Sequence, residues 1–186
     1  MSDSTIRQRL ARWAVLPAAI GLGLGLSAFS APAAEAATHY CNGYKATIVG
    51  TNGADDIEGT SGRDVIVGLG GNDDIDGNGG DDIICAGSGH DEVDGGSGND
   101  YINGGSGHDE LEGGSGNDRI YGSSGNDHIE GESGKDKLYG QSGHDLVEGG
   151  SGKDTVSGGS GKDTVKQGSA SEREEDRWED RYGYDD

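Results

Sequence analysis

The stretch GTNGADDIE, residues 50–58, is the first of thirteen nine-residue units that follow one another without insertion and end with GGSGKDTVK, residues 158–166. The units share the consensus G-G-x-G-x-D-x-U-x, in which U is aliphatic. The first position is glycine except in the fifth unit, which has Ala86, and the fourth position is always glycine. A flexible glycine-rich linker would not keep such positions in phase over 117 residues, so the pattern predicts an ordered repetitive fold.

The sixth position of the unit is aspartate in all thirteen repeats, and the eighth is always Ile, Val or Leu. The aspartates, our candidate metal ligands, are Asp55, Asp64, Asp73, Asp82, Asp91, Asp100, Asp109, Asp118, Asp127, Asp136, Asp145, Asp154 and Asp163. Calcium takes oxygen ligands from carboxylates, main-chain carbonyls and water. Glycines allow the positive φ angles that turn carbonyls inward. The unit therefore supplies the two kinds of ligand that Ca²⁺ prefers.

This nonapeptide resembles the calcium-binding repeat of the RTX, or haemolysin-type, proteins, which fold as a parallel β-roll. The resemblance covers residues 50–166 of the chain. It implies that one ion lies between each loop and the loop one coil later, held by Asp side chains and loop carbonyls. Thirteen loops divide into stacks of seven and six. With one ion in each gap, the resemblance implies about eleven Ca²⁺ ions at most.

The outward strand positions alternate in character from one unit to the next. Positions seven to nine read as a short strand in which only the middle side chain points inward. In odd-numbered units the outward positions are mostly acidic: Asp56 and Glu58, Asp74 and Asp76, Glu92 and Asp94, Glu110 and Glu112, His128 and Glu130. In even-numbered units they are Val65 and Val67, Ile83 and Cys85, Tyr101 and Asn103, Arg119 and Tyr121, Lys137 and Tyr139. The alternation predicts an all-β fold, a parallel β-roll solenoid of thirteen nonapeptide repeats, two per coil.

The chain has little apolar core with which to fold by itself. The only systematic core is one aliphatic residue per nonapeptide, and ordering a glycine-rich backbone is entropically costly. After residue 36 the chain has 33 Asp and Glu against 11 Lys and Arg, a net charge near −22. We therefore expect a disordered chain that folds on binding Ca²⁺, with metal binding supplying the folding free energy.

Residues 1–36 have the three parts of a secretory signal peptide. Arg7, Arg9 and Arg12 precede an apolar run over residues 13–29, and two Ala-x-Ala endings follow at 31–36. We expect cleavage near residues 33–37 and a secreted, extracellular protein with no membrane span left after cleavage. The alternative is an uncleaved membrane anchor, which Pro17 and several glycines in the apolar run disfavour.

Cys41 and Cys85 are the two cysteines of the chain. Cys85 lies beside Val65, Val67 and Ile83, the only aliphatic cluster among the outward strand positions. An N-terminal cap segment, residues 37–49, is the nearest candidate to cover this cluster with Tyr40, Tyr44, Ile48 and Val49. Such a cover would bring Cys41 to Cys85, so we expect a disulfide in an oxidising compartment. The alternatives are two free thiols or intermolecular pairing.

Residues 167–186 leave the repeat and form a strongly charged tail. Ser171 and Glu174 fit a helix capping box, and Trp178 and Tyr182 would lie on one helical face. We expect either a polar cap that closes the last coil or a disordered acidic tail.

Catalytic motifs are missing from a sequence that is almost wholly repeat. It has no HExxH zinc pattern, no G-x-S-x-G nucleophile elbow and no P-loop, so we expect no enzyme activity. We also expect no nucleic-acid partner. His90, His108 and His144 at the variable fifth position are interpreted as solvent-facing loop residues rather than metal ligands.

Two functions fit the sequence. The first is a secreted calcium-binding protein without activity of its own. The second is a calcium-dependent adhesin or interaction module that binds a cell-surface glycan or protein. Its candidate partner face comprises Tyr101, Arg119, Tyr121, Lys137 and Tyr139 of the even-numbered units. Aromatic and cationic side chains suit such a role, although tyrosine also favours strands for structural reasons.

Overall fold

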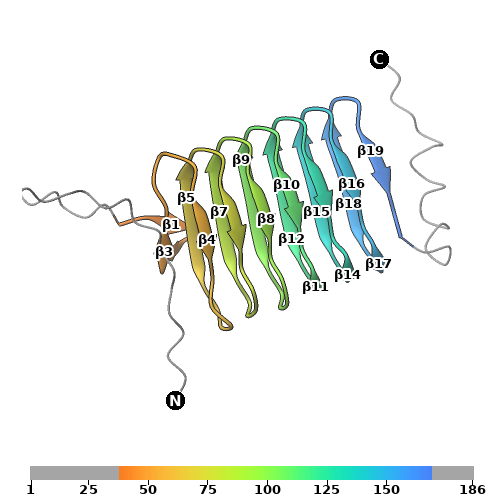
Figure 1. The fold of residues 1–186 in the computed structure, drawn as a ribbon. Helices are drawn as coiled ribbons and strands as arrows, with labels where there is room; N and C mark the ends of the chain where they lie inside the picture. Colours follow the sequence, from red (N-terminus) through yellow and green to blue (C-terminus); the bar gives the residue numbers. More distant parts are fainter. Residues whose placement is uncertain (1–37, 169–186) are drawn as a thin grey trace, which may run out of the picture.

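The structure is a computed structural model that describes residues 38–168, and its main feature is a pair of seven-stranded parallel sheets. Successive coils stack side by side, and each adds one strand to each sheet (Figure 1). The odd sheet, from odd-numbered units, contains β4 (Asp56–Glu58), β6 (Asp74–Asp76), β8 (Glu92–Asp94), β10 (Glu110–Glu112), β13 (His128–Glu130), β16 (Leu146–Glu148) and β19 (Thr164–Lys166). The even sheet contains β3 (Ile48–Val49), β5 (Val65–Gly70), β7 (Ile83–Ser88), β9 (Tyr101–Ser106), β12 (Arg119–Ser124), β15 (Lys137–Ser142) and β18 (Thr155–Ser160).

Each strand pairs in parallel register with the residues eighteen positions later in the chain, so Ile84 lies beside Ile102 and Val93 beside Leu111. This register stacks the eighth-position aliphatic side chains into one core between the two sheets. Their side chains are almost fully buried along the middle of the roll, whereas Val165 in the last described coil is 38% exposed. The predicted all-β fold, a parallel β-roll with stacked coils, is confirmed.

The strands of the two sheets differ in length, which the nonapeptide does not predict. The odd strands have three residues, as expected for positions seven to nine, whereas β5 and the later even strands have six. The even strands continue through the first three positions of the following loop, which belongs to an odd-numbered unit. The even-numbered loops instead pair with one another in a third sheet of β11 (Ser115–Gly116), β14 (Ser133–Gly134) and β17 (Ser151–Gly152).

A short antiparallel hairpin of β1 (Tyr40–Cys41) and β2 (Tyr44–Lys45) precedes the repeats. The expected disulfide is confirmed, since Cys41 and Cys85 are bonded with their Cα atoms 5.8 Å apart. Cys41 packs with Val65, Val67 and Ile83 in a second core cluster on the outer face of the even sheet. The predicted cover is thus present.

The residues that form this cover differ from the prediction. Tyr40 and Tyr44 are 62% and 50% exposed, and Ala46 packs on the cluster in their place. Ile48 of β3 packs against the main core instead, in register with Ile66. The roll therefore begins half a coil before the first nonapeptide, inside the segment predicted to be a cap.

Several predictions concern residues outside the described range. The signal peptide at 1–36 lies there, as do the capping box of Ser171 and Glu174 and the aromatic pair of Trp178 and Tyr182. Between residues 38 and 168 there is no helix of the length and apolarity needed to cross a membrane.

Candidate metal centres

The sixth-position aspartates form two ladders, one along each stack of loops. In every gap between coils, the main-chain N–H of one aspartate donates a hydrogen bond to Oδ1 of the aspartate eighteen residues later. The eleven bonds measure 2.6 to 3.1 Å, and one example is Asp100 N–H to Asp118 Oδ1 at 2.8 Å. Strand stacking thus fixes the position and direction of each carboxylate.

The second oxygen of these carboxylates lacks a partner. Within the described residues, ten Oδ2 atoms are buried without any hydrogen bond: those of Asp73, Asp82, Asp91, Asp100, Asp109, Asp118, Asp127, Asp136, Asp145 and Asp154. Buried polar atoms are nearly always satisfied, and a buried unpaired carboxylate is strongly destabilising. Ten orphaned oxygens at one repeated position therefore indicate a ligand, and their charge requires a cation.

Main-chain carbonyls reach the same places as these orphaned oxygens. If a Cβ were added to Gly131, it would stand 2.6 Å from the carbonyl oxygen of Gly149 in the next coil and 2.8 Å from Asp136 Oδ2. The same construction at Gly95 gives 2.8 Å both to the Gly113 carbonyl oxygen and to Asp100 Oδ2. Glycine at the first position therefore keeps open a space in which carboxylate and carbonyl oxygens converge.

The donor set fits a hard cation. Across residues 38–168, no three side chains of His, Cys, Asp or Glu gather in a way that could hold a metal ion. An ion held between coils would use main-chain carbonyls beside the sixth-position aspartates. Oxygen-only coordination of this kind suits Ca²⁺ and does not suit Zn²⁺, which prefers nitrogen and sulfur ligands.

In the first loop of each stack, hydrogen bonds from a threonine satisfy the second carboxylate oxygen of the aspartate without a metal ion. Thr51 donates to Asp55 Oδ2 from its N–H at 2.6 Å and from its hydroxyl at 2.9 Å. Thr60 makes the same two bonds to Asp64 Oδ2, both at 2.8 Å. These threonines stand at the second position of their units. Asp55 and Asp64 thus differ from the other predicted ligands, whereas Asp163 in the last loop accepts the N–H of Asp145 as the ladder requires.

We expect Asp109→Asn to raise the Ca²⁺ concentration at the folding midpoint by about tenfold, equivalent to roughly 1.4 kcal/mol. The amide is isosteric and can still accept the N–H of Asp91, but it brings no negative charge to the gap. The matched control is Asp55→Asn, which changes a carboxylate that Thr51 already satisfies. Circular dichroism during calcium titration measures both variants. Equal shifts in the two midpoints would contradict this assignment.

Burial raises the pKa of the aspartates in the middle of each ladder. The pKa of Asp100 rises to about 7, and those of Asp109, Asp118 and Asp136 rise to about 6. Desolvation is the largest cause, the hydrogen bond from the preceding coil partly offsets it, and repulsion between neighbouring aspartates adds to it. The metal-free roll thus holds carboxylates that resist ionisation at neutral pH.

This shift predicts how pH affects the metal-free chain. A pKa raised in the folded state means that the folded chain binds more protons than the unfolded one, so acid stabilises the fold. The stabilisation is complete below the unfolded pKa of about 3.9 and is lost as the pH rises through about 6 to 7. In the presence of a calcium chelator, we expect the strand signal in circular dichroism to be larger at pH 4.5 than at pH 7.5. A signal that falls on acidification would contradict this expectation.

The fifth position of the unit contributes a hydrogen-bond ladder that sequence reasoning missed. His90, His108 and His144 are exposed, as predicted, but their Nδ1 atoms accept main-chain N–H groups one coil later. Asn99 Oδ1 does the same for Asn117 in the other stack. The feature of the sequence that indicates this ladder is the frequent occurrence of Asn, Asp and His at the fifth position. These side chains support the stacking of loops.

The five residues of the predicted partner face lie on the even sheet in two separate rows. Tyr101, Arg119 and Lys137 occupy seventh positions, and Tyr121 and Tyr139 occupy ninth positions. The rings of Tyr121 and Tyr139 are stacked with centroids 5.1 Å apart, and those of Tyr101 and Tyr121 are tilted at 5.6 Å. The face is therefore ordered.

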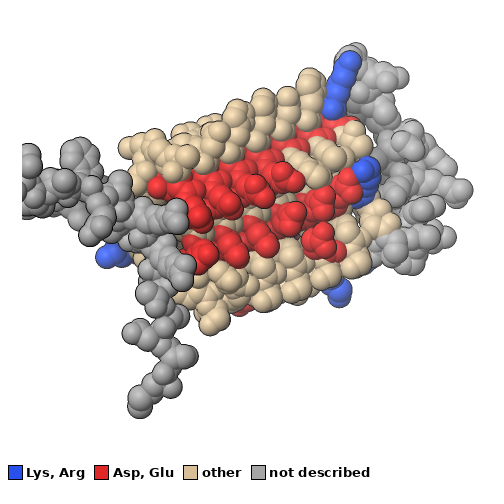
Figure 2. All heavy atoms as spheres, in the orientation of Figure 1, with Lys and Arg blue, Asp and Glu red and all other residues tan. Residues whose placement is uncertain are grey.

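The outward positions of the odd sheet are mostly acidic from β4 to β10 instead. Figure 2 shows Asp and Glu gathered in rows along one face of the roll. The row at the seventh position contains Asp56, Asp74, Glu92 and Glu110. The two faces of the roll thus differ in charge.

Comparison with known proteins agrees with this geometry. The model of the RTX calcium-binding nonapeptide repeat matches the chain in overlapping windows at residues 49–84, 76–111, 86–120, 104–138, 112–147 and 130–165. No curated protein matches the chain. The matched windows include all the coils whose aspartates carry orphaned oxygens. The chain belongs to the family of RTX calcium-binding nonapeptide repeat proteins.

Proposed function

We propose that this protein is an exported calcium-binding protein whose roll folds when Ca²⁺ occupies the gaps between its loops. The supporting observation is the set of ten buried carboxylate oxygens without hydrogen-bond partners. Each ion would be held by sixth-position aspartates and by carbonyls of adjacent loops. Bound Ca²⁺ supplies the positive charge that these carboxylates need in a desolvated place. The proposed role is binding and structural rather than enzymatic.

The number of sites in this proposal follows from the gaps. Eleven inter-coil hydrogen bonds end on the aspartates from Asp73 to Asp163, one for each gap. We therefore propose about eleven ions at most. Asp163 is less buried than its neighbours, so the ion in the last gap should be the weakest.

Chelation tests the coupling between metal and fold. In Ca²⁺ we expect a strand-rich circular dichroism spectrum, and in excess EDTA at pH 7.5 a spectrum dominated by disorder. Isothermal titration calorimetry then gives the stoichiometry, and Mg²⁺ at the same concentration serves as a control because it demands a tighter octahedral geometry. A strand-rich spectrum that chelation leaves unchanged would overturn the proposal.

The disulfide supports export, because such bonds persist in oxidising compartments. Expression of the full chain, followed by terminal sequencing of protein from the medium, tests this part of the proposal. We expect a new N-terminus near residues 33–37. Recovery of an intact chain in the membrane fraction would favour the anchor instead.

The second candidate function is a calcium-dependent interaction module. It is favoured by the contacting rings of Tyr101, Tyr121 and Tyr139 near Arg119 and Lys137, on a sheet face whose outward positions carry no carboxylate in β5 to β18. Replacing the three tyrosines with serine separates this function from the first. Loss of binding to cells with unchanged calcium binding would support the module, and unchanged cell binding would argue against it.

A further inference from the structure

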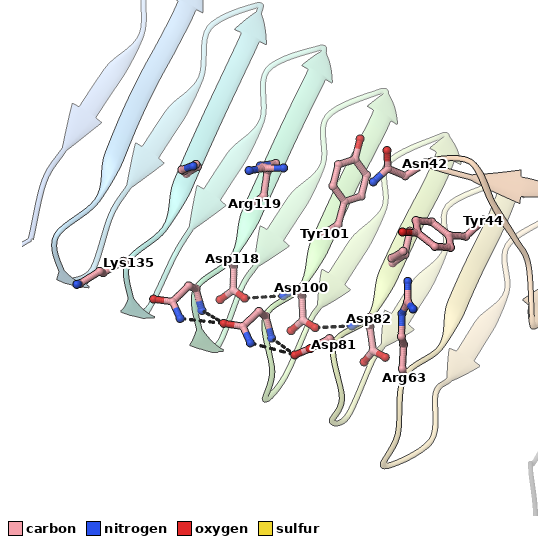
Figure 3. Close-up of a pocket in the computed structure, with 14 residues that line it drawn as sticks. Asn42, Tyr44, Arg63, Asp81, Asp82, Asp100, Tyr101, Asp118, Arg119 and Lys135 are labelled. Carbon is pink, nitrogen blue, oxygen red and sulfur yellow. Dashed lines mark hydrogen bonds between the residues drawn. The ribbon is translucent and has the colours of Figure 1, made fainter.

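Two rows of side chains enclose a groove along the even-numbered loops, and we call it the even groove. Its volume is about 610 Å³. Arg63 and Lys135 stand on one side at fifth positions, and Tyr101 and Arg119 stand on the other at seventh positions (Figure 3). Lys137, the seventh-position residue beside Arg119 on the next strand, also lines the groove. The groove crosses several coils, so a ligand that fills it must be elongated.

The floor of the even groove consists of the predicted metal ligands Asp82, Asp100 and Asp118. Counting Asp81, four carboxyl groups and four cationic side chains line the groove, so its charges balance without metal only when all four carboxyl groups are ionised. Three of the four carboxylates belong to the ladder with orphaned oxygens. Divalent ions in those gaps would leave the groove with a net positive charge.

The cationic side chains of the groove are available to a ligand. Arg119, Lys135 and Lys137 are exposed, and within residues 38–168 they form no salt bridge. Arg119 and Lys137 lie directly beside each other on adjacent strands. Arg119 and Lys137 place one cation on each of two successive coils, which fits a chain of repeating anionic groups better than a compact anion.

Two aromatic rings line the same groove in its N-terminal half. Tyr44 and Tyr101 both line it, and the guanidinium carbon of Arg63 lies 4.6 Å from the centroid of the Tyr44 ring. Such rings present flat apolar faces with a polar edge, which suit the faces of sugar rings. The planar arginine fork binds carboxylate or sulfate groups with two parallel hydrogen bonds.

We propose that the even groove binds a linear acidic glycan, a sugar chain bearing carboxylate or sulfate groups, and that bound Ca²⁺ makes it competent to do so. The inference rests on the proposed function, because the metal both orders the coils and neutralises the floor of the groove. It narrows the ligand of the calcium-dependent interaction module described above to an acidic glycan and gives the calcium dependence a physical cause.

The opposite stack of loops provides an internal comparison. A groove of about 500 Å³ runs along the odd-numbered loops, between fifth-position residues such as His90 and His108 and seventh-position residues such as Glu92 and Glu110. Its described lining contains no lysine or arginine. The two grooves have the same architecture and opposite side-chain chemistry, so an acidic ligand should select the even one.

Binding of fluorescently labelled glycans tests the proposal at saturating Ca²⁺. Heparin carries sulfates and carboxylates, hyaluronate carries carboxylates alone, and dextran is neutral. We expect at least one acidic glycan to bind, dextran not to bind, and polyglutamate to bind more weakly than the acidic glycan. The affinity should fall as salt increases. Binding of polyglutamate as tight as that of every glycan would overturn the assignment of a sugar ligand.

The variant Arg119→Gln/Lys137→Gln should weaken glycan binding by about tenfold. The matched control is Lys162→Gln, an exposed fifth-position residue of the odd-numbered loops, which should bind as the unmodified chain does. Circular dichroism in Ca²⁺ must show that all three proteins are folded, which separates failure of this inference from failure of calcium-driven folding. Absence of glycan binding by the folded, unmodified chain, or equal losses in both variants, would overturn the proposal.

Discussion

Replacing Gly107 with alanine is expected to disrupt the roll at its centre. Gly107 occupies the fourth position of its unit with a φ of +146°, a conformation that L-residues rarely adopt. An added Cβ would also stand only 2.5 Å from the carbonyl carbon of Gly89, one coil earlier. Because the clash is with the backbone of the stacked coil, rotation of a flexible side chain cannot relieve it. We expect a loss of about 3 kcal/mol or more, measured as a lower thermal midpoint and a higher calcium midpoint.

The control for this prediction is Gly53→Ala, the same motif position in the first unit. No earlier coil lies behind Gly53, and an added Cβ would meet only the Thr51 hydroxyl at 3.8 Å. Its φ lies outside the left-handed region, so alanine is not strained there. We expect a change within about 0.5 kcal/mol. Similar losses in the two variants would show that the glycine matters for the loop alone rather than for stacking between coils.

This pair also shows why the fold could be predicted from the repeat. The clash of Gly107 with Gly89 is a contact across eighteen residues, and the alternation of outward positions indicates that same spacing. Because each coil repeats the last, one correct period places every eighth-position side chain in the core and every sixth-position aspartate in a ladder. The pairing of Cys41 with Cys85 followed in turn from the one apolar cluster on the outer face.

Features that depend on departures from the repeat were not predicted. Ile48 enters the core because Thr47, Ile48 and Val49 match strand β5 at the coil spacing, although the glycine and aspartate of the motif are missing there. Thr51 and Thr60 donate hydroxyl hydrogen bonds to Asp55 and Asp64 in the first loops, at a second position that the consensus leaves variable in these units. The exposed Tyr40 and Tyr44 depend on the hairpin geometry of β1 and β2, which two-residue strands do not indicate.

The N-terminal coils have several sources of stability that the later coils lack. A second apolar cluster of Cys41, Val65, Val67 and Ile83 covers the even sheet there. The disulfide closes a loop of 44 residues. Thr51 and Thr60 satisfy their aspartates with hydroxyl and main-chain donors. None of these contacts requires a metal ion, so the first coils should retain structure that the rest of the roll loses in chelator.

Removing the disulfide is therefore expected to have a large effect at this end of the roll. In the chain-entropy model, a cross-link across 44 residues stabilises the folded state by about 4 kcal/mol. We expect Cys41→Ala/Cys85→Ala, or reduction of the unmodified chain, to raise the calcium midpoint and to lower the thermal midpoint. The two cysteine-to-alanine changes also remove sulfur atoms from the second cluster, in which Cys41 is only 1% exposed, so the reduced unmodified chain, which keeps both sulfur atoms, serves as the control for packing.

Hydrogen exchange in chelator locates the effect along the chain. Amide protons in β5 and β7 of the oxidised protein should be protected, whereas those in β15 and β18 should exchange as in a disordered chain. Reduction should remove the protection of β5 and β7, because the loop-closure entropy is then restored to the unfolded chain. On adding Ca²⁺, protection should spread from the N-terminal coils toward β18, since each ordered coil presents half of the next metal site. Uniform protection along the roll, or protection that begins at β18, would contradict the expectation that folding starts at the N-terminal coils.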